Sequence, residues 1–326
     1  MTKKLLFTRN AAPWRYNYFF TIFAIMKLSI IIATYNREHS LLAALASLAG
    51  QTAPDSDWEC IVVDNNCTDN TQTAVADFAR RHPDMNLRAV TESRQGLSHA
   101  RNRGIAESRG RYIAVIDDDE TVNSTFVQAY IDLFDNNSAW SVAGGRVTAC
   151  YPAGRPAWLS PLTERPIANP MDFGTRVRPF PRGRIPAGGN MAFRREVLER
   201  YGGFEPSLGR TGTALTGGEE NDLFERMAAD GVTFAYVPDA AINHIIGPEK
   251  LTADYFSRLS RGTGASQLRR AVLHGRRGRL YVAEAAKWVA TLLLAAGYAV
   301  TLRPDKGLWL IKMRSGITRG IFCTRT

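Results

Sequence analysis

Short apolar segments rich in β-branched residues alternate, from residue 27 onward, with segments whose apolar residues recur at helical spacing. The apolar segments predict strands over residues 27–33, 58–64, 87–91 and 111–116. The intervening segments predict helices over residues 39–49, 70–81 and 97–107. Asp69 is well placed to cap the second of these helices. Such alternation predicts an α/β fold, in which helices cover both faces of a mostly parallel sheet.

The pattern weakens between residues 150 and 186, which hold eight of the fifteen prolines and six arginines. A segment of this kind is usually a long loop that is functional or mobile. Order returns at residues 188–205, which predict a turn, a short strand and a helix. Residues 217–245 predict an acidic helix and a strand, with His244 several residues beyond the strand.

The net charge of +10 comes entirely from the C-terminal segment. Residues 251–326 contain fourteen Lys and Arg against three acids, whereas residues 1–250 contain 27 bases and 28 acids. Most of the chain therefore lacks the basic excess that nucleic-acid binding requires, and we predict no nucleic-acid partner.

The same segment contains an uncharged stretch, "WVATLLLAAGYAVTL" at residues 288–302, with basic residues on both sides. A membrane-spanning helix needs roughly 20 apolar residues, so this stretch is short for a span. We interpret it as a helix that lies on an anionic membrane surface. A buried helix docked on the main domain and a true span are the alternatives.

Residues 1–25 carry two lysines and an apolar run of eight residues without a cleavage pattern. We interpret them as an extension upstream of a natural start at Met26, or as a weak anchor. The predicted organisation is this extension, a domain over residues 26–250 and a basic helical region over residues 251–326. The four cysteines have no spacing typical of a disulfide framework or a zinc site, which predicts reduced thiols in a cytoplasmic protein.

Four consecutive acids, Asp117 to Glu120, follow the last of the four predicted strands. Ligands of open α/β sheets bind at the carboxyl ends of the strands. Two carboxylates one residue apart can face the same Mg²⁺ or Mn²⁺, which would also relieve their mutual repulsion. Alternatively, one acid caps a helix that follows while its neighbours are solvated.

Two other positions carry candidate chemistry. His244 lies in the apolar context "AAINHII", where a histidine is more often structural, but the acidic cluster lacks a third metal ligand. Glu219, Glu220 and Asp222 fall in the first turn of a predicted helix, where acids are ordinary partners of the helix dipole. A carboxylate beside an apolar wall can instead have its pKa raised toward that of a catalytic base.

Five segments together resemble the successive motifs of bacterial family-2 glycosyltransferases with the GT-A fold. They are, in order, "KLSIIIATYNRE", "CIVVDNNCTDNT", "RQGLSHARNRGIAESRGRYIAVIDDDE", "GGNMAFRREVLERYGGFE" and "GGEENDLFERM". The resemblance covers about residues 27–247 and implies a Rossmann-like GT-A domain followed by the basic helical tail.

The resemblance implies a donor site for a nucleotide sugar. Thr34 and Asp64 would contact the nucleotide, with Asp64 reading the base, and Arg37 would lie on the donor side. Arg101 and Asn102 stand in the family's "ARN" segment and would orient the diphosphate.

The resemblance also implies which residues bind the metal ion and which residue is the catalytic base. Asp117 and Asp119 match the outer pair of the family's D-x-D motif, so Asp119 would hold Mg²⁺ or Mn²⁺ and Asp117 would face the ribose or a metal-bound water. Asp118 would be the variable middle position, and Glu120 would lie at a helix start. His244 matches the histidine that completes the metal shell in some relatives. Glu220 falls on the catalytic base, where the family usually has Asp, so Glu219 is an alternative.

These roles imply inverting transfer of a sugar from a nucleotide donor, with UDP-sugars favoured, to a hydroxyl of a glycan or lipid-linked acceptor. The basic tail predicts a peripheral location on the cytoplasmic face of the inner membrane. The first alternative is a non-catalytic relative that binds nucleotide sugars or glycans. A phosphate-accepting regulatory domain would need paired acids after the first strand, where this chain has "TYNRE". A nucleotidyltransferase would need a Gly-rich basic loop there.

Overall fold

The computed structural model describes residues 26–212 and 214–323. The four predicted strands form the parallel part of one sheet, in the order β3-β2-β1-β4. They are β1 (Leu28–Thr34), β2 (Trp58–Asp64), β3 (Leu87–Thr91) and β4 (Tyr112–Asp117). The helices between them are α1 (Glu38–Leu48), α2 (Thr71–Arg81) and α3 (Leu97–Glu107). All seven elements lie within one residue of their predicted bounds.

The sheet continues beyond β4 as a mixed sheet in the order β8-β6-β9-β5. These strands are β8 (Met191–Arg194), β6 (Val142–Cys150), β9 (Ala235–Ile245) and β5 (Glu120–Val122), and β7 (Arg178–Pro179) pairs with β9. Strand β8 runs antiparallel to β4 and β6, whereas β6 and β9 run parallel. Strand β9 extends farther than predicted, so His244 lies within a strand and not beyond one.

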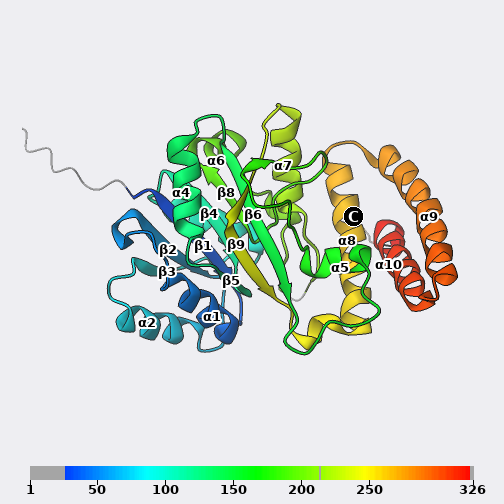
Figure 1. Ribbon diagram of the computed structural model, residues 1–326, viewed down its shortest axis with the longest axis horizontal. Coiled ribbons are helices and arrows are strands. Elements are labelled where there is room, and N and C mark those ends of the chain that lie inside the picture. The colour runs from blue at the N-terminus through cyan, green and yellow to red at the C-terminus, as the bar shows by residue number, and fades with distance from the viewer. Residues whose placement is uncertain (1–25, 213, 324–326) are drawn as a thin grey trace, which may run out of the picture.

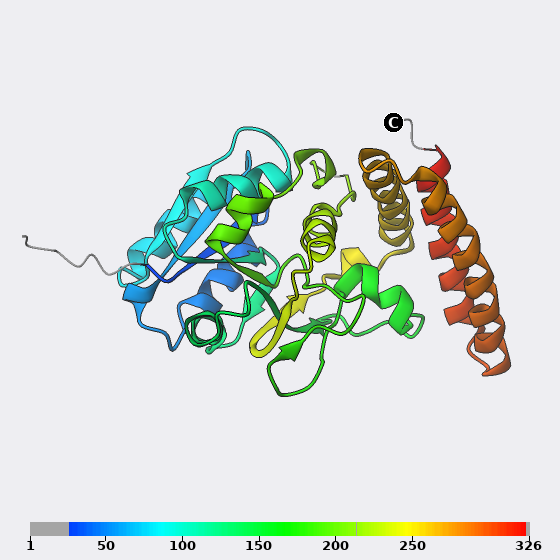
Figure 2. The ribbon, with the colours of Figure 1, turned by 90° about the horizontal axis from the view of Figure 1, so that it is seen from above.

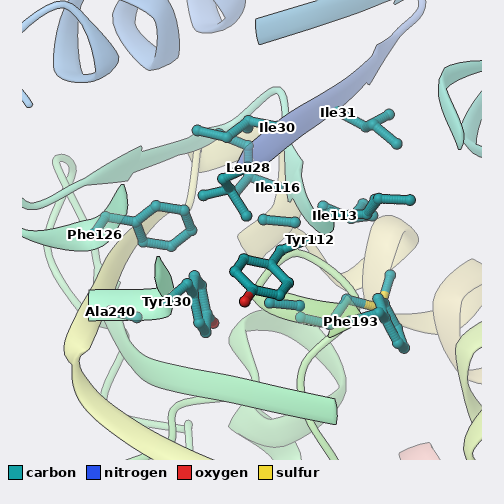
Figure 3. Packing of buried hydrophobic residues seen from close by; sticks show 14 of the residues in the cluster. Leu28, Ile30, Ile31, Tyr112, Ile113, Ile116, Phe126, Tyr130, Phe193 and Ala240 are labelled. Atoms are coloured by element: carbon teal, nitrogen blue, oxygen red, sulfur yellow. The ribbon is translucent and has the colours of Figure 1, made fainter. Parts of the chain in front are cut away.

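The core lies on both faces of the sheet. Ile30 and Ile31 point to opposite faces of β1, and both are fully buried. Figure 3 shows aromatic side chains from β4, β8 and α4 (Phe126–Asn136) in this core. The one polar atom of Tyr112 is satisfied, because its hydroxyl donates a hydrogen bond to Asp135 Oδ1 at 2.6 Å. The sheet is therefore packed on both faces and positions the residues at the ends of its strands.

Three long C-terminal helices stand beside the sheet (Figures 1 and 2). They are α8 (Ala253–Leu273), α9 (Arg277–Val300) and α10 (Pro304–Cys323), and α10 packs against both others. The crossing of α8 and α10 requires glycine. A Cβ atom added at Gly264 would lie 2.0 Å from the Ile317 carbonyl oxygen, and one at Gly320 would lie 2.1 Å from that of Arg261. This close contact ties α10 to the rest of the protein.

The apolar helix α9 packs against α10 but is mostly exposed, unlike the buried, docked helix of the alternative interpretation. Of its residues only Glu284 and Thr291 are buried. Val282, Leu293 and Val300 are 73%, 70% and 84% exposed. The helix is long and apolar enough to cross a bilayer, and 17% of its most apolar window is buried, which by itself is weak support for a span.

Three smaller sequence predictions have mixed outcomes. The four cysteines are free thiols, as predicted. Asp69 accepts a hydrogen bond from the Thr71 amide, but the N-cap of α2 is Asn70. The segment 150–186 is not wholly irregular, because it contains α5 (Pro161–Ala168) and β7. The interpretation of residues 1–25 lies outside the described residues.

Candidate active site

A large cavity of about 1110 Å³ lies at the carboxyl ends of β1 and β4. One side is formed by the strand ends, by residues 185–189 and by the start of α7 (Glu219–Ala229). The opposite side is formed by α5 and by the three C-terminal helices. The cavity is thus lined from both sides of the boundary predicted at residue 250.

The four acids occupy a tight reversal between β4 and β5. Asp117 ends β4 and Glu120 begins β5, where it pairs with His244 of β9. The prediction that Glu120 starts a helix is wrong, because α4 begins only at Phe126. The residues after Asp119 form strand β5, which pairs with β9, and do not form a helix. Asp119 and His244 therefore become neighbours.

Glu120 is a structural residue of this reversal. It is 3% exposed, and its Oε2 accepts a hydrogen bond from the Asp117 amide at 3.1 Å. Burial, together with the charges of Asp117 and Asp119, raises its pKa well above the usual range. Gly189 makes room for this carboxyl group, since an added Cβ there would lie 2.2 Å from Glu120 Oε2.

Asp118 has a defined place and is not simply a variable middle position. Its side chain is nearly buried, and its Oδ2 accepts a hydrogen bond from Thr34 Oγ1 at 2.9 Å. Burial raises the pKa of Asp118 to about 7, although Arg37 opposes the shift. Thr34, which was predicted to contact the nucleotide, thus fixes the acidic turn from the end of β1.

Asp119 is surrounded by positive charge. Lys250 Nζ and Arg37 Nη1 both lie 2.5 Å from Asp119 Oδ2, and His244 Nε2 lies 3.7 Å from Oδ1. Burial by itself would raise the pKa of Asp119, but Lys250, His244 and Arg37 outweigh it and lower the pKa. Lys250 lies in a short 3-10 helix, Pro248–Leu251, and no sequence pattern indicated its role.

His244 is oriented as a metal ligand would be. Its Nδ1 lies 3.2 Å from the Ala168 carbonyl oxygen, which can only accept, so Nδ1 carries the proton. Nε2 then presents its lone pair toward Asp119. Burial lowers the pKa of His244, which favours the neutral form that metals bind. The carboxylate and imidazole of this pair fit Mg²⁺ or Mn²⁺. No group of three or more such ligands is assembled within residues 26–212 and 214–323.

Arg101 connects the acidic turn to α7. Its guanidinium is 2% exposed and donates to Asp117 Oδ1 at 2.7 Å, to Glu219 Oε1 at 2.8 Å and to the Gly188 carbonyl at 3.0 Å. Its neighbour Asn102 does not reach the cavity. The Asn102 amide group bonds both the carbonyl and the amide of Phe204, which fixes the loop after α6 (Arg195–Tyr201).

The two glutamates at the start of α7 differ in their surroundings. Glu219 is buried beside Arg101, and burial together with the charge of Glu220 raises its pKa to about 7. Glu220 is half-buried, lines the cavity and accepts a hydrogen bond from Asn221 Nδ2 at 2.6 Å. Glu220 is therefore the more accessible of the two to a bound molecule.

Asp64 lies at the end of β2, beside Thr34 of β1. It is buried, and its carboxylate accepts hydrogen bonds from the Cys67 amide, at 2.7 Å, and from Gln72. Asn65, and not Asp64, is among the residues that line the cavity.

The fold and this arrangement of acids at the strand ends define a class of protein, the α/β proteins with the predicted GT-A fold. Residues 29–202 match the sequence profile of glycosyl transferase family 2, which is more than half of the chain. The protein belongs to this family and is a glycosyltransferase.

Relatives of known name agree with this assignment. The glucosyl-dolichyl phosphate glucuronosyltransferase of Haloferax volcanii is 28% identical over 231 residues, covering 67% of this chain and 69% of that protein. The succinoglycan biosynthesis protein ExoM of Rhizobium meliloti is 26% identical over 236 residues, covering 72% and 71%.

Solved structures confirm the predicted fold class. The mannosyltransferase PcManGT of Pyrobaculum calidifontis, in complex with GDP-Man and Mn²⁺, has a TM-score of 0.59 at 19% identity and covers 92% of this chain and 88% of its own. TarS 1–349 of S. aureus, in complex with UDP, has a TM-score of 0.53 at 18% identity, covering 91% and 90%.

Proposed function

We propose that this protein transfers a sugar from a nucleoside-diphosphate sugar to a hydroxyl group of a glycan or lipid-linked acceptor, with inversion at the anomeric carbon. The products would serve cell-surface polysaccharide or glycolipid synthesis. The observation that carries this proposal is the Arg101 bridge, which holds the D-x-D turn and the Glu219–Glu220 pair around one cavity.

The donor would lie along the strand ends. Thr34, Arg37 and Asp117 stand at this edge, and Arg101 holds Asp117 in place. Asp64 is assigned to the base by the family resemblance. Asn102, which the resemblance assigns to the diphosphate, instead bonds the Phe204 backbone and would support the site from there. UDP is favoured as the nucleotide. The solved relatives contain UDP in one case and GDP-Man in another.

Asp119 and His244 would hold a divalent cation, with Asp117 beside them. When bound, Mg²⁺ or Mn²⁺ supplies positive charge to stabilise the departing diphosphate. Lys250 and Arg37 contact the same Asp119 oxygen and keep this carboxylate ionised, and a bound metal ion would compete with them for it. Mn²⁺ is present in the complex of the mannosyltransferase.

Glu220 would act as the base. It accepts the proton of the acceptor hydroxyl, whose oxygen attacks the anomeric carbon from the face opposite the leaving group, and the bond to the nucleoside diphosphate breaks. Glu219 is held away from this role by its bond to Arg101. No covalent bond to the enzyme is needed.

We further propose that α9 lies on an anionic membrane surface, which would place the enzyme peripherally on the cytoplasmic face of the inner membrane. Support comes from the exposed apolar residues of α9 and from the arginines at its N-terminal end, Arg276, Arg277 and Arg279, all of which are exposed.

Thermal unfolding with a panel of nucleotide sugars tests the function. A bound donor at 100 times its Kd stabilises the folded state by about 2.7 kcal/mol. We expect one nucleotide class to raise Tm by several degrees with Mn²⁺ and by much less after chelation. Asp119→Asn should abolish this ligand-dependent increase. If no nucleotide sugar raises the Tm of the wild-type protein, the proposed function is wrong.

A further inference from the structure

The two ends of the cavity differ in charge. Its acidic lining residues all belong to the turn Asp117–Glu120 and to the Glu219–Glu220 pair. The end formed by α5 and the C-terminal helices contributes no acid among the described residues. It contributes four cations, Arg165, Arg270, Lys287 and Arg314. An anion is therefore attracted to this second end.

Two of these cations lack a counter-ion. Arg314 pairs with Glu284 at 2.9 Å, and Arg270 is 3.5 Å from Glu225. Arg165 and Lys287 have no carboxylate within 4 Å in the part of the chain that the structure describes. Burial and the nearby Arg314 lower the pKa of Lys287, as expected for an ammonium group placed beside other cations. A bound anion would relieve this repulsion.

Exposed apolar side chains lie on the same two helices as the unpaired cations. Leu294 of α9 is 46% exposed and Leu162 of α5 is 42% exposed, although both line the cavity. Lys287, Thr291 and Leu294 fall on one face of α9, because they are spaced by four and three residues. The same helix face thus offers both a positive charge and an apolar surface to one ligand.

We propose that this end of the cavity binds the phosphate or diphosphate of a lipid-linked glycan, whose anionic group lies at Lys287 beside Arg314 and whose lipid chain follows the apolar face of α9. This inference rests on the proposed function and identifies its acceptor as an amphiphile. The charge complementarity favours this occupant. A nucleotide sugar offers the same phosphate chemistry but has no apolar chain to cover Leu294, and a neutral glycan would leave the cations unpaired.

Binding of dodecyl phosphate, below the concentration at which it forms micelles, tests the inference by calorimetry on the full chain. Inorganic phosphate and neutral dodecyl maltoside are the matched ligands. We expect dodecyl phosphate to bind at least tenfold more tightly than either, because it alone has both the charge and the chain. Lys287→Glu and Leu294→Asn should each weaken its binding by about tenfold. Lys306→Glu on α10 is the matched control, since this lysine does not line the cavity.

Nucleotide stabilisation with Mn²⁺ is measured on the same proteins. The inference requires all three variants to retain the stabilisation by the nucleotide sugar. Three results would overturn the inference: equal binding of dodecyl maltoside, equal loss in the Lys306 control, or a loss of nucleotide binding in Lys287→Glu that matches its loss of dodecyl phosphate binding. The last result would show that these cations bind the nucleotide-sugar donor and not the acceptor. If wild-type protein binds no nucleotide at all, the proposed function fails separately.

Discussion

Replacing Arg101 by methionine removes the cation that joins the acidic turn to α7. The guanidinium is 2% exposed, and Glu219, which it contacts at 2.8 Å, is also 2% exposed. Removing one partner of a buried ion pair typically costs about 3–5 kcal/mol, because the other charge is left uncompensated. We expect a loss of unfolding free energy in this range for Arg101→Met at pH 9, where Glu219 is ionised in the wild-type protein. The larger part of this loss should come from the unpaired charge of Glu219, since Asp117 is more exposed to solvent.

The loss should depend on pH. The pKa of Glu219 is raised to about 7 by burial, even though Arg101 opposes the shift. A carboxyl group with a raised pKa stabilises the folded state fully below its unfolded pKa, and this stability is lost as pH rises through the folded pKa. Without Arg101 the folded pKa of Glu219 rises further. The difference between wild type and variant should therefore be small at pH 6 and grow between pH 7 and 9.

Urea unfolding followed by tryptophan fluorescence measures both effects. The double variant Arg101→Met/Glu219→Gln is the control, because a neutral pair removes the unpaired buried charge. It should recover at least half of the stability that Arg101→Met loses. A loss under about 1 kcal/mol at pH 9, or no recovery in the double variant at that pH, would show that the buried pair does not organise the site.

Three further variants test other parts of the account. Asn102→Ala should lower the free energy of unfolding by about 1–3 kcal/mol, because it leaves Phe204 backbone groups unpaired. It should not change nucleotide binding. A loss of nucleotide binding without a loss of stability would show that Asn102 contacts the donor. Lys250→Met should tighten Mn²⁺ binding by about tenfold in a titration, because no ammonium group then competes for Asp119; weaker binding would contradict this competition. Leu293→Asp should reduce sedimentation with anionic vesicles by about tenfold, because one leucine side chain would no longer be buried in the membrane surface. Unchanged sedimentation would contradict the proposal that α9 lies on the membrane.

The parallel half of the sheet was predictable because its signals are local. Each strand from Leu28 to Asp117 is a short apolar segment ended by polar residues, and each helix repeats its own apolar face. Helix α5 also carries a local signal that the proline content obscured. Ser160 and Thr163 form a capping box and Pro161 occupies the first helical position, where proline is favoured.

The remaining features depend on contacts between distant parts of the chain. Glu120 lies in a strand because it pairs with His244, and nothing near Glu120 in the sequence indicates that partner. Lys250 likewise reaches Asp119 only because the chain after β9 turns back across the cavity. Motif resemblance brought Asp119 and His244 together, but a residue outside the motifs, such as Lys250, could not be found that way.

The most direct test of the account measures nucleoside diphosphate release from the stabilising nucleotide sugar with Mn²⁺. Wild-type protein, Glu220→Gln and Glu219→Gln are compared, with Glu225→Gln as the matched change farther along α7. We predict that Glu220→Gln lowers the rate by about 10² to 10⁴ while donor binding stays within twofold of wild type, and that Glu225→Gln changes neither. A near-normal rate in Glu220→Gln, with Glu219 intact, would contradict the assignment of Glu220 as the base.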